Sequence, residues 1–374
     1  MKIVKIGDLE VSEVCAGTMT FGSFNSKEET FAMLDRLVEL GVNFFDTAEL
    51  YPVAFNYGAT TELWLGEWLE GQKQGGRIYV ATKVNPRGVG SGGGPHAFEA
   101  DRVLESCRQS LARLKVDRID LYYLHFPSRM GQEVFGWGSY DADRYRESRT
   151  SSGEMAVFEK QVLAIKQLLD SGLVSHWGLS NENAYGVTMF CVTADRLGVP
   201  RPVAIQNDLS LNNRVFESDV WEACEYFGIK GIPYGVLAGG VLTGKYVDPD
   251  SYAGDRPLDM ARHNAYPEFQ PRYHRSVPAR RAAEEYVSLA RDYGMKPLDL
   301  ALVWARDRPY NEAVIIGTTT VDQVDACVRA VSARPPLPPD LLAKIDRVHE
   351  KYRNPQAAYA KKTLLFDDDA ELWW

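Results

Sequence analysis

The chain of 374 residues repeats a unit in which a short apolar segment of strand character precedes a helical pattern. Strands that alternate with helices predict a parallel sheet, and eight such units predict a sheet closed into a (β/α)8 barrel. An open, doubly wound α/β sheet is the alternative. We expect the eight strands at 14–17, 42–46, 78–83, 119–124, 174–179, 203–206, 229–233 and 313–316.

Amphipathic patterns between these segments predict the helices. Glycines follow three of them, Gly41, Gly172 and Gly228, at the position where a glycine commonly ends a helix. Residues 2–11 alternate around a Gly-Asp pair, which predicts an N-terminal β-hairpin. We expect helices at 27–40, 59–71, 102–114, 159–172, 219–228, 279–294, 297–307 and 321–331.

Two connections are much longer than the usual few residues, at about 126–153 and about 235–278. They follow the fourth and seventh strands, so on a barrel they lie at the active-site face, where long loops are usually functional. We expect substrate choice to depend on both. Residues 1–350 are expected to form a single barrel domain, and 351–374 a C-terminal tail whose role the sequence leaves open.

A residue that can hydrogen-bond or ionise stands at the end of every predicted strand. Because the carboxyl ends of barrel strands meet at one rim, these side chains are expected to gather there. Any one of them is compatible with a structural role, but the complete set favours a catalytic site. In chain order they are Thr18, Asp46, Lys83, His125, Ser180–Asn181, Gln206–Asn207, Tyr234 and 317–319.

Four side chains near this rim suit proton transfer to a carbonyl oxygen: Asp46, Tyr51, Lys83 and His125. A phenol has a pKa of about 10, and a neighbouring cation lowers it. Lys83 can supply the cation and Asp46 can hold it by a charge-assisted hydrogen bond. Tyr51 would then be the general acid, and His125 would donate a hydrogen bond to the same oxygen. These four residues include no nucleophile and no metal, so a bound hydride donor must supply the reducing equivalent.

Composition excludes several classes of function. The formal net charge of −9 argues against nucleic-acid binding. No apolar run reaches membrane-spanning length, and the first residues do not form a signal-peptide core. Five cysteines inside predicted elements are typical of buried, reduced thiols in a cytoplasmic protein. The absence of CxxC and HExxH spacing argues against a zinc site.

The chain resembles the aldo-keto reductase superfamily over nearly its whole length. An insert after Tyr51 is most similar to the bacterial Tas-type branch. The matching motifs are VCAGTMTFG (14–22), GVNFFDTAELYP (41–52), ATKV (81–84), DLYYLHFP (120–127), GLSNE (178–182), LTGKY (242–246) and IIGTTTVDQ (315–323).

The resemblance implies a TIM barrel plugged by its hairpin, and a nicotinamide cofactor bound without a Rossmann domain. It implies that Asp46, Tyr51, Lys83 and His125 are the catalytic tetrad.

The same resemblance assigns the cofactor contacts. It places Ser180, Asn181 and Gln206 against the nicotinamide carboxamide and Tyr234 against the nicotinamide ring. It places Lys245 in a cofactor clamp. The expected contacts are Thr18, Met19, Asp46, Ser180, Asn181, Gln206, Tyr234, Leu237, Lys245, Arg272, and, at the adenosine end, Gly317, Thr319 and Gln323.

Some positions depart from the family pattern. Cys327 stands where the family has an Asn against adenine, and Gly235–Val236 replace a Ser-Pro pair. Residues 317–323 contain no Arg or Lys for a 2′-phosphate, and Arg272 is the candidate for that role. NADPH is therefore expected from the family's preference, with NADH as the alternative.

The leading interpretation is an NADPH-dependent reductase of a small aldehyde or ketone. The same chemistry run as an alcohol dehydrogenase in a biosynthetic pathway is an alternative. So is a cofactor-binding sensor or regulatory subunit without significant turnover. A metal-dependent hydrolase is disfavoured because no cluster of His and Asp ligands is evident. Homo-oligomerisation stays open.

Overall fold

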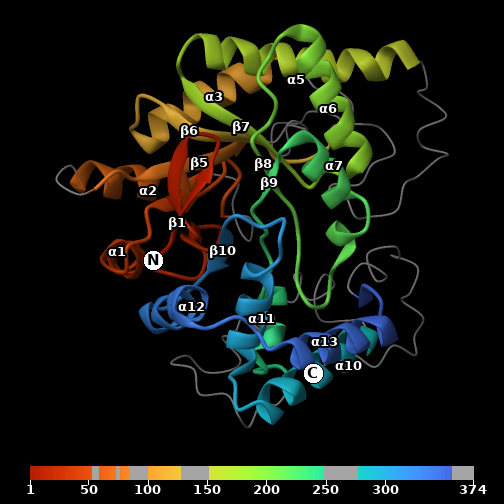
Figure 1. Cartoon of the computed structure of the whole chain (residues 1–374). Helices are drawn as coiled ribbons and strands as arrows, with labels where there is room; N and C mark the ends of the chain where they lie inside the picture. Colours follow the sequence, from red (N-terminus) through yellow and green to blue (C-terminus); the bar gives the residue numbers. More distant parts are fainter. Residues whose placement is uncertain (53–58, 73–75, 85–99, 128–150, 248–276, 356–374) are drawn as a thin grey trace, which may run out of the picture.

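The computed structural model describes residues 1–52, 59–72, 76–84, 100–127, 151–247 and 277–355 (Figure 1). Most of the two long connections lies outside these residues, as do Arg272 and positions 356–374 of the expected tail. No described helix is long and apolar enough to cross a membrane. All five cysteines are buried free thiols, as predicted.

Within the described residues, ten strands form a two-stranded hairpin and an eight-stranded parallel sheet. The hairpin pairs β1 (Ile3–Ile6) with β2 (Leu9–Ser12). The eight predicted strands are confirmed, although the seventh has only two residues. The sheet comprises β3 (Val14–Gly17), β4 (Phe44–Asp46), β5 (Tyr79–Val84), β6 (Ile119–Leu124), β7 (Val174–Ser180), β8 (Ala204–Gln206), β9 (Lys230–Gly231) and β10 (Val314–Gly317).

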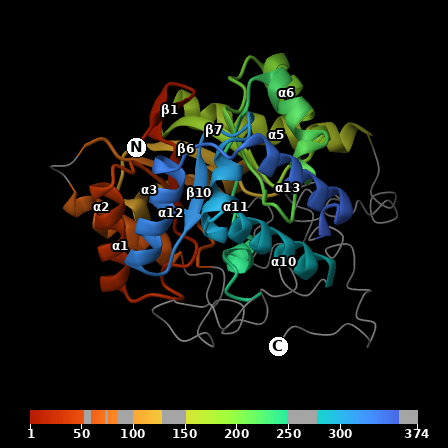
Figure 2. The same ribbon diagram turned by 60° about the horizontal axis from the view of Figure 1, so that its bottom comes forward.

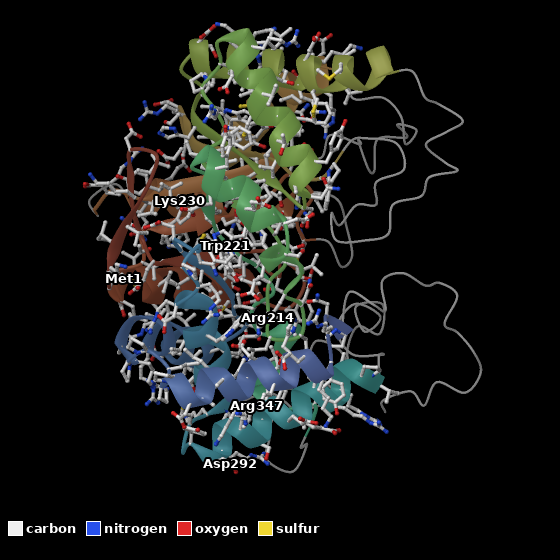
Figure 3. All side chains as sticks on the ribbon, turned by 45° about the vertical axis from the view of Figure 1, so that its right-hand side comes forward. Met1, Arg214, Trp221, Lys230, Asp292 and Arg347 are labelled. Carbon is white, nitrogen blue, oxygen red and sulfur yellow. The ribbon has the colours of Figure 1, made fainter. Side chains whose placement is uncertain are left out.

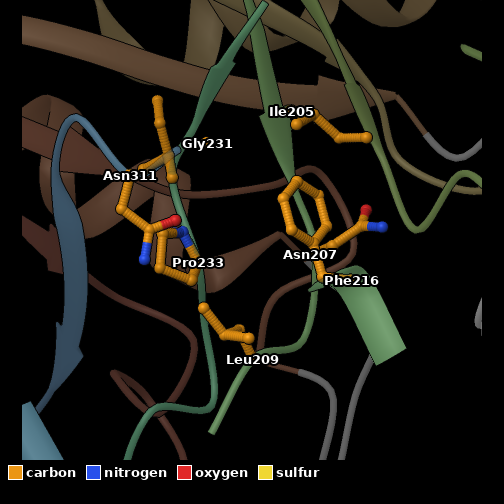
Figure 4. A pocket seen from close by; sticks show the side chains of 8 residues that line it. Ile205, Asn207, Leu209, Phe216, Gly231, Pro233 and Asn311 are labelled. Atoms are coloured by element: carbon orange, nitrogen blue, oxygen red, sulfur yellow. The ribbon is translucent and has the colours of Figure 1, made fainter. Parts of the chain in front are cut away.

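The sheet curls until its last strand pairs with its first: β10 lies beside β3. The remaining seam is closed by backbone hydrogen bonds. Gly231 N donates to Tyr310 O over 2.8 Å, Glu312 N to Gly231 O over 2.9 Å, and Ile315 N to Pro233 O over 3.0 Å. Figure 4 shows this seam, with Asn311 facing Gly231 and Pro233. A β-carbon on Gly231 would lie 2.6 Å from the Tyr310 carbonyl oxygen, so a side chain there would push the seam apart. The (β/α)8 barrel is therefore confirmed and the open sheet excluded.

The helices cover the outside of the barrel (Figures 1 and 2). Helices α6 and α13 are not among those that the sequence predicted, and α5 begins eight residues earlier than expected. The helices are α1 (Lys27–Glu39), α2 (Thr60–Gly71), α3 (Ala100–Leu114), α5 (Ser151–Asp170), α6 (Ala184–Leu197), α7 (Val220–Phe227), α10 (Val277–Asp292), α11 (Pro297–Arg306), α12 (Val321–Ala333) and α13 (Pro339–Lys351), with 3-10 turns η1 (Val215–Glu217) and η2 (Ala238–Thr243).

Local sequence explains how individual helices begin and end. Ser26 and Glu29 form a capping box at the start of α1, in which each side chain accepts from the other residue's N–H. Gly41 follows that helix with φ +85°, a left-handed conformation that favours glycine. A long-range ion pair also connects the segment after β8 to α13. Arg214 Nη1 donates to Asp346 Oδ1 over 2.8 Å, and Figure 3 labels Arg214 next to Arg347 of the same helix.

Two apolar cores lie on opposite faces of the sheet. The outer core fills the space between strands and helices, and includes Tyr122 and Leu124 of β6. The inner core fills the barrel, and includes Leu121 and Tyr123 of the same strand. Four hairpin side chains belong to the inner core, so the hairpin closes the amino-terminal end of the barrel: Val4, Ile6, Leu9 and Val11.

Candidate active site

The centre of the carboxyl-terminal rim is a buried ion pair. Lys83 Nζ lies 2.5 Å from Asp46 Oδ1, and it donates a second hydrogen bond to the Thr47 carbonyl oxygen over 2.8 Å. The Lys83 side chain is fully buried and that of Asp46 is 4% exposed. Burial alone would lower the pKa of Lys83, but Asp46 and Tyr51 outweigh it and the pKa is raised. The ammonium therefore stays charged at neutral pH.

Tyr51 reaches the same ammonium from the loop after β4. Its hydroxyl lies 3.4 Å from Lys83 Nζ, and the cation lies 4.9 Å from the centre of the phenol ring. The residue is 8% exposed, so a cation beside it acts in a medium with little water. This arrangement can stabilise a phenolate and so ease proton transfer from the phenol.

The loop that carries Tyr51 is anchored by Glu49, a residue that the sequence reasoning missed. Its backbone N–H donates to the Lys83 carbonyl oxygen over 3.3 Å. Its carboxylate accepts from Arg102 Nη2 and from Ser106 Oγ, both over 2.6 Å. Both partners belong to α3, more than 50 residues away in sequence. The one signal for this anchor in the sequence is the acidic character of Glu49, which stands between Asp46 and Tyr51.

His125 faces Tyr51 across the site. Their ring centres lie 5.8 Å apart with the planes at 80°, and the Phe126 ring stacks on the imidazole with the ring centres 4.1 Å apart. His125 Nδ1 is buried and has no hydrogen-bond partner among the described residues. Burial lowers the pKa of His125 well below its usual value, and Lys83 lowers it further. The imidazole is therefore neutral at neutral pH.

Amide and hydroxyl side chains at the ends of β7 and β8 and after β9 form hydrogen bonds next to Asp46. Gln206 Nε2 donates to Asp46 Oδ2 over 2.8 Å. Asn181 Nδ2 donates to the His125 carbonyl oxygen over 2.9 Å and to Ser180 Oγ over 3.1 Å. Tyr234 donates to Asn181 Oδ1 over 2.5 Å. The structure thus brings together the four residues expected around the nicotinamide.

The residues expected at the first strand end lie at the same rim. The Thr18 hydroxyl donates to the Asp46 carbonyl oxygen over 2.8 Å. Met19 packs with Phe126 against a small apolar cluster formed by Ala48, Leu50 and Tyr51. Among the described residues, apolar side chains therefore pack around the Tyr51 phenol.

The residues expected at the adenosine end gather at the start of α12. Thr320 caps this helix by accepting from Gln323 N over 3.3 Å, and Gln323 Oε1 accepts from Thr319 N over 3.0 Å. Gly317 stands exposed at the end of β10. The N–H groups of Thr319 and Gln323 are therefore both hydrogen-bonded within this turn.

Lys245 and Leu237 flank η2. The Lys245 ammonium lies 5.1 Å from the centre of the Tyr246 ring. A β-carbon on Gly240, which has φ +100°, would lie 3.2 Å from the same nitrogen, so Lys245 lies over a bare backbone. Leu237 packs against the outer core.

Cys327, on α12, is buried in the outer core. Burial raises its pKa to about 12. The departure from the family pattern at this position therefore places an apolar core residue where the family has an amide.

Comparisons with known proteins agree with this geometry. A family model described as "Aldo/keto reductase family" matches residues 13–350. The chain is 34% identical over 355 residues to "Protein tas" of Escherichia coli (strain K12), covering 93% of this chain and 96% of that protein. It is 31% identical over 287 residues to an "Aldo-keto reductase" of Babesia bovis, covering 75% and 98%. It is 28% identical over 348 residues to a "Probable voltage-gated potassium channel subunit beta" of Oryza sativa subsp. japonica, covering 91% and 93%.

Proposed function

Because this chain belongs to the aldo/keto reductase family, whose members generally use NAD(P)H, we propose that it reduces an aldehyde or ketone with NADPH and that Tyr51 is the general acid. The observation that carries the proposal is the contact between the Tyr51 hydroxyl and the Lys83 ammonium, which Asp46 holds in place. When bound, the nicotinamide supplies the hydride. The four residues of the rim manage the proton.

In this proposal the phenol gives its proton to the carbonyl oxygen. Lys83 stabilises the phenolate that remains, because the two groups are 3.4 Å apart in a buried site. The reaction is reversible, so the same phenolate accepts a proton when an alcohol is oxidised. A proton from solvent restores the phenol after each turnover.

His125 is proposed to hold the carbonyl plane. A neutral imidazole has one N–H, and its buried Nδ1 has no acceptor among the described residues. The proton is therefore better placed on Nε2, from which it can be donated to the substrate oxygen. Removing a donor of this kind typically costs roughly 10²- to 10³-fold in kcat.

The donors at the rim fit a nicotinamide cofactor. A carboxamide has one acceptor and one donor group, and Ser180, Asn181 and Gln206 offer hydroxyl and amide groups of both kinds. Tyr234 offers an aromatic face beside them. We assign the adenosine end to Gly317, Thr319 and Gln323 at the start of α12. We assign a phosphate to Lys245, since an ammonium favours anions. We assign the 2′-phosphate to Arg272, which lies outside the described residues.

The test is turnover of 4-nitrobenzaldehyde by the full chain, followed through NADPH absorbance. Wild type should oxidise NADPH, and Tyr51→Phe should lower kcat by roughly 10²- to 10⁴-fold. NADPH fluorescence should give nearly the same dissociation constant for both proteins. Retained turnover in the variant would remove Tyr51 from its role, and equal affinities for NADPH and NADH would refute the cofactor preference.

A cofactor-binding regulatory subunit is the second candidate, because one relative carries the name of a potassium channel subunit. Wild type that binds NADPH but turns over no member of a broad carbonyl panel would favour it.

A further inference from the structure

Tyr234 makes a hydrogen bond that the proposed function does not use. The residue follows β9 at the carboxyl-terminal rim, and its hydroxyl donates to Asn181 Oδ1 over 2.5 Å. The proposed function needs only the ring of Tyr234, as an aromatic face for the nicotinamide. A phenylalanine would supply that face equally well, so the hydroxyl needs a separate explanation.

The side chain of Asn181 is fixed at its nitrogen end. Nδ2 donates to the His125 carbonyl oxygen over 2.9 Å and to Ser180 Oγ over 3.1 Å, so both of its N–H groups are engaged. A carbonyl oxygen only accepts, so the end of the amide that faces His125 must be the nitrogen. The end that faces Tyr234 is then the oxygen, and the phenol must be the donor.

The backbone of Asn181 is held as well. Its φ is +59°, in the left-handed region that Asn adopts more readily than most residues. Its N–H donates to the Gln206 carbonyl oxygen over 3.2 Å, and the residue is 2% exposed. The hydroxyl of Tyr234 therefore adds a third fixed point to a residue already held at its backbone and at its amide nitrogen.

The same contacts determine what this part of the rim offers to a ligand. The Ser180 hydroxyl donates to the Gln206 carbonyl oxygen over 2.8 Å, and Gln206 Nε2 donates one N–H to Asp46 Oδ2. Together with the contacts of Asn181, these use all but one of the N–H and O–H groups on the three side chains. Asn181 Oδ1 and Ser180 Oγ each accept one hydrogen bond and have a second lone pair. Asn181 and Ser180 therefore face a ligand as acceptors.

We propose that Tyr234 is a positioning residue: its hydroxyl holds Asn181 Oδ1 in place, so that this oxygen accepts from the amino group of the nicotinamide carboxamide. Without the hydroxyl, the amide is held only at its nitrogen. Its oxygen is then a buried acceptor that has lost its donor, and it turns toward another partner. A phenol O–H lies in the plane of its ring, so this hydrogen bond does not obstruct the ring faces. The inference rests on the proposed binding of a nicotinamide at this rim.

Two analogues of NADP⁺ separate the two halves of the carboxamide. The 3-acetylpyridine analogue replaces the amino group with a methyl group, so Asn181 Oδ1 would meet carbon. The thionicotinamide analogue keeps the amino group and exchanges the carbonyl oxygen for sulfur. A site that recognises the amino group through an acceptor should discriminate against the first analogue and accept the second.

The experiment measures the dissociation constants of NADP⁺ and of both analogues by quenching of protein fluorescence, which needs no substrate. In wild type, the acetylpyridine analogue should bind about tenfold more weakly than NADP⁺, which is the effect of one hydrogen bond. The thionicotinamide analogue should bind within about twofold of NADP⁺. In Tyr234→Phe, the tenfold difference should fall to about twofold. Equal affinities for NADP⁺ and the acetylpyridine analogue in wild type would overturn the proposal, whether or not the variant folds.

Tyr310 supplies a matched control. It is 5% exposed, it precedes β10 at the amino-terminal end of the barrel, and its hydroxyl donates to Glu217 Oε1 over 2.8 Å. Glu217 keeps its ion pair with Arg214 when this phenol is replaced. Tyr234→Phe and Tyr310→Phe should both lower the melting temperature, because each loses a hydrogen bond. Only Tyr234→Phe should change the ratio of the two dissociation constants, and a lower melting temperature with an unchanged ratio would reduce its hydroxyl to a structural role.

Asn181→Gly tests the link between the two residues. Glycine tolerates a φ of +59° and removes the amide, so this variant should lose the tenfold difference by itself. Adding Tyr234→Phe to it should change the ratio no further, because the oxygen that the phenol holds is gone. A further change in the double variant would show that the phenol acts through another group, against the proposal.

These measurements also separate the positioning role from the proposed reaction. Wild type that shows the expected ratios but turns over no carbonyl compound would refute the reaction and leave the positioning role standing. Turnover of 4-nitrobenzaldehyde with equal affinities for NADP⁺ and the acetylpyridine analogue would do the reverse. Wild type that does not bind NADP⁺ would refute both.

Discussion

The ammonium of Lys83 lies 2.5 Å from the carboxylate of Asp46 inside the barrel, where neither side chain has more than 4% of its surface exposed. Two charges without water around them depend on one another, because each alone would be a buried, unpaired ion. The pair therefore affects stability as well as chemistry.

Replacing Asp46 with Asn should destabilise the fold by about 3–5 kcal/mol, because it leaves a buried ammonium without its counter-ion. The double variant Asp46→Asn/Lys83→Met should recover part of that loss, because the unpaired charge is gone. Urea unfolding of the single and double variants measures both effects. Additive losses would show that the two charges do not stabilise one another.

His125 should make stability depend on pH. Its folded-state pKa is well below the ordinary value of about 6.5, so the unfolded chain binds a proton before the folded one does. The stabilisation is fully present above about pH 6.5 and is lost as the pH falls toward the folded-state pKa. His125→Gln should remove this part of the dependence. Unfolding free energies of both proteins between neutral and acid pH test it, and parallel curves would contradict it.

Much of this site was predictable because its parts stand at strand ends. An apolar run that closes on Asp46, Lys83 or His125 fixes which rim the side chain occupies, and the register then brings them together. Glu49 was not predictable in the same way. The importance of Glu49 depends on α3, which lies more than 50 residues along the chain.

Tyr122 and Tyr123 show a second limit. Two adjacent tyrosines in a strand must face opposite sides, but composition does not say which one faces inward. In the structure, Tyr123 lies with Leu121 on the face of the inner core, and Tyr122 lies with Leu124 on the face of the outer core. Helix α6 escaped prediction for another reason: β-branched residues and Gly186 weaken its helical pattern.

Glu49→Ala should slow the reaction without weakening cofactor binding. The loop to Tyr51 loses its two bonds to α3, so the phenol is held less well beside Lys83. We expect kcat to fall roughly tenfold, since small misplacements of a catalytic group are costly. Glu39→Ala is the control, because Glu39 pairs with Arg36 on the exposed face of α1. Equal kcat values for wild type and Glu49→Ala would argue that the anchor is dispensable.

Restoring the family's residue at Cys327 should not strengthen cofactor binding. The side chain is 2% exposed in the outer core, so Asn would bury an amide with no partner in place. We expect Cys327→Asn to lower the free energy of unfolding by about 1–3 kcal/mol and to leave the NADPH dissociation constant unchanged. Cys327→Ala is the control, because it removes the thiol and adds no polar group. Should Cys327→Asn bind NADPH more tightly than Cys327→Ala at equal stability, position 327 would face the adenosine after all, and the start of α12 would have to rearrange to allow it.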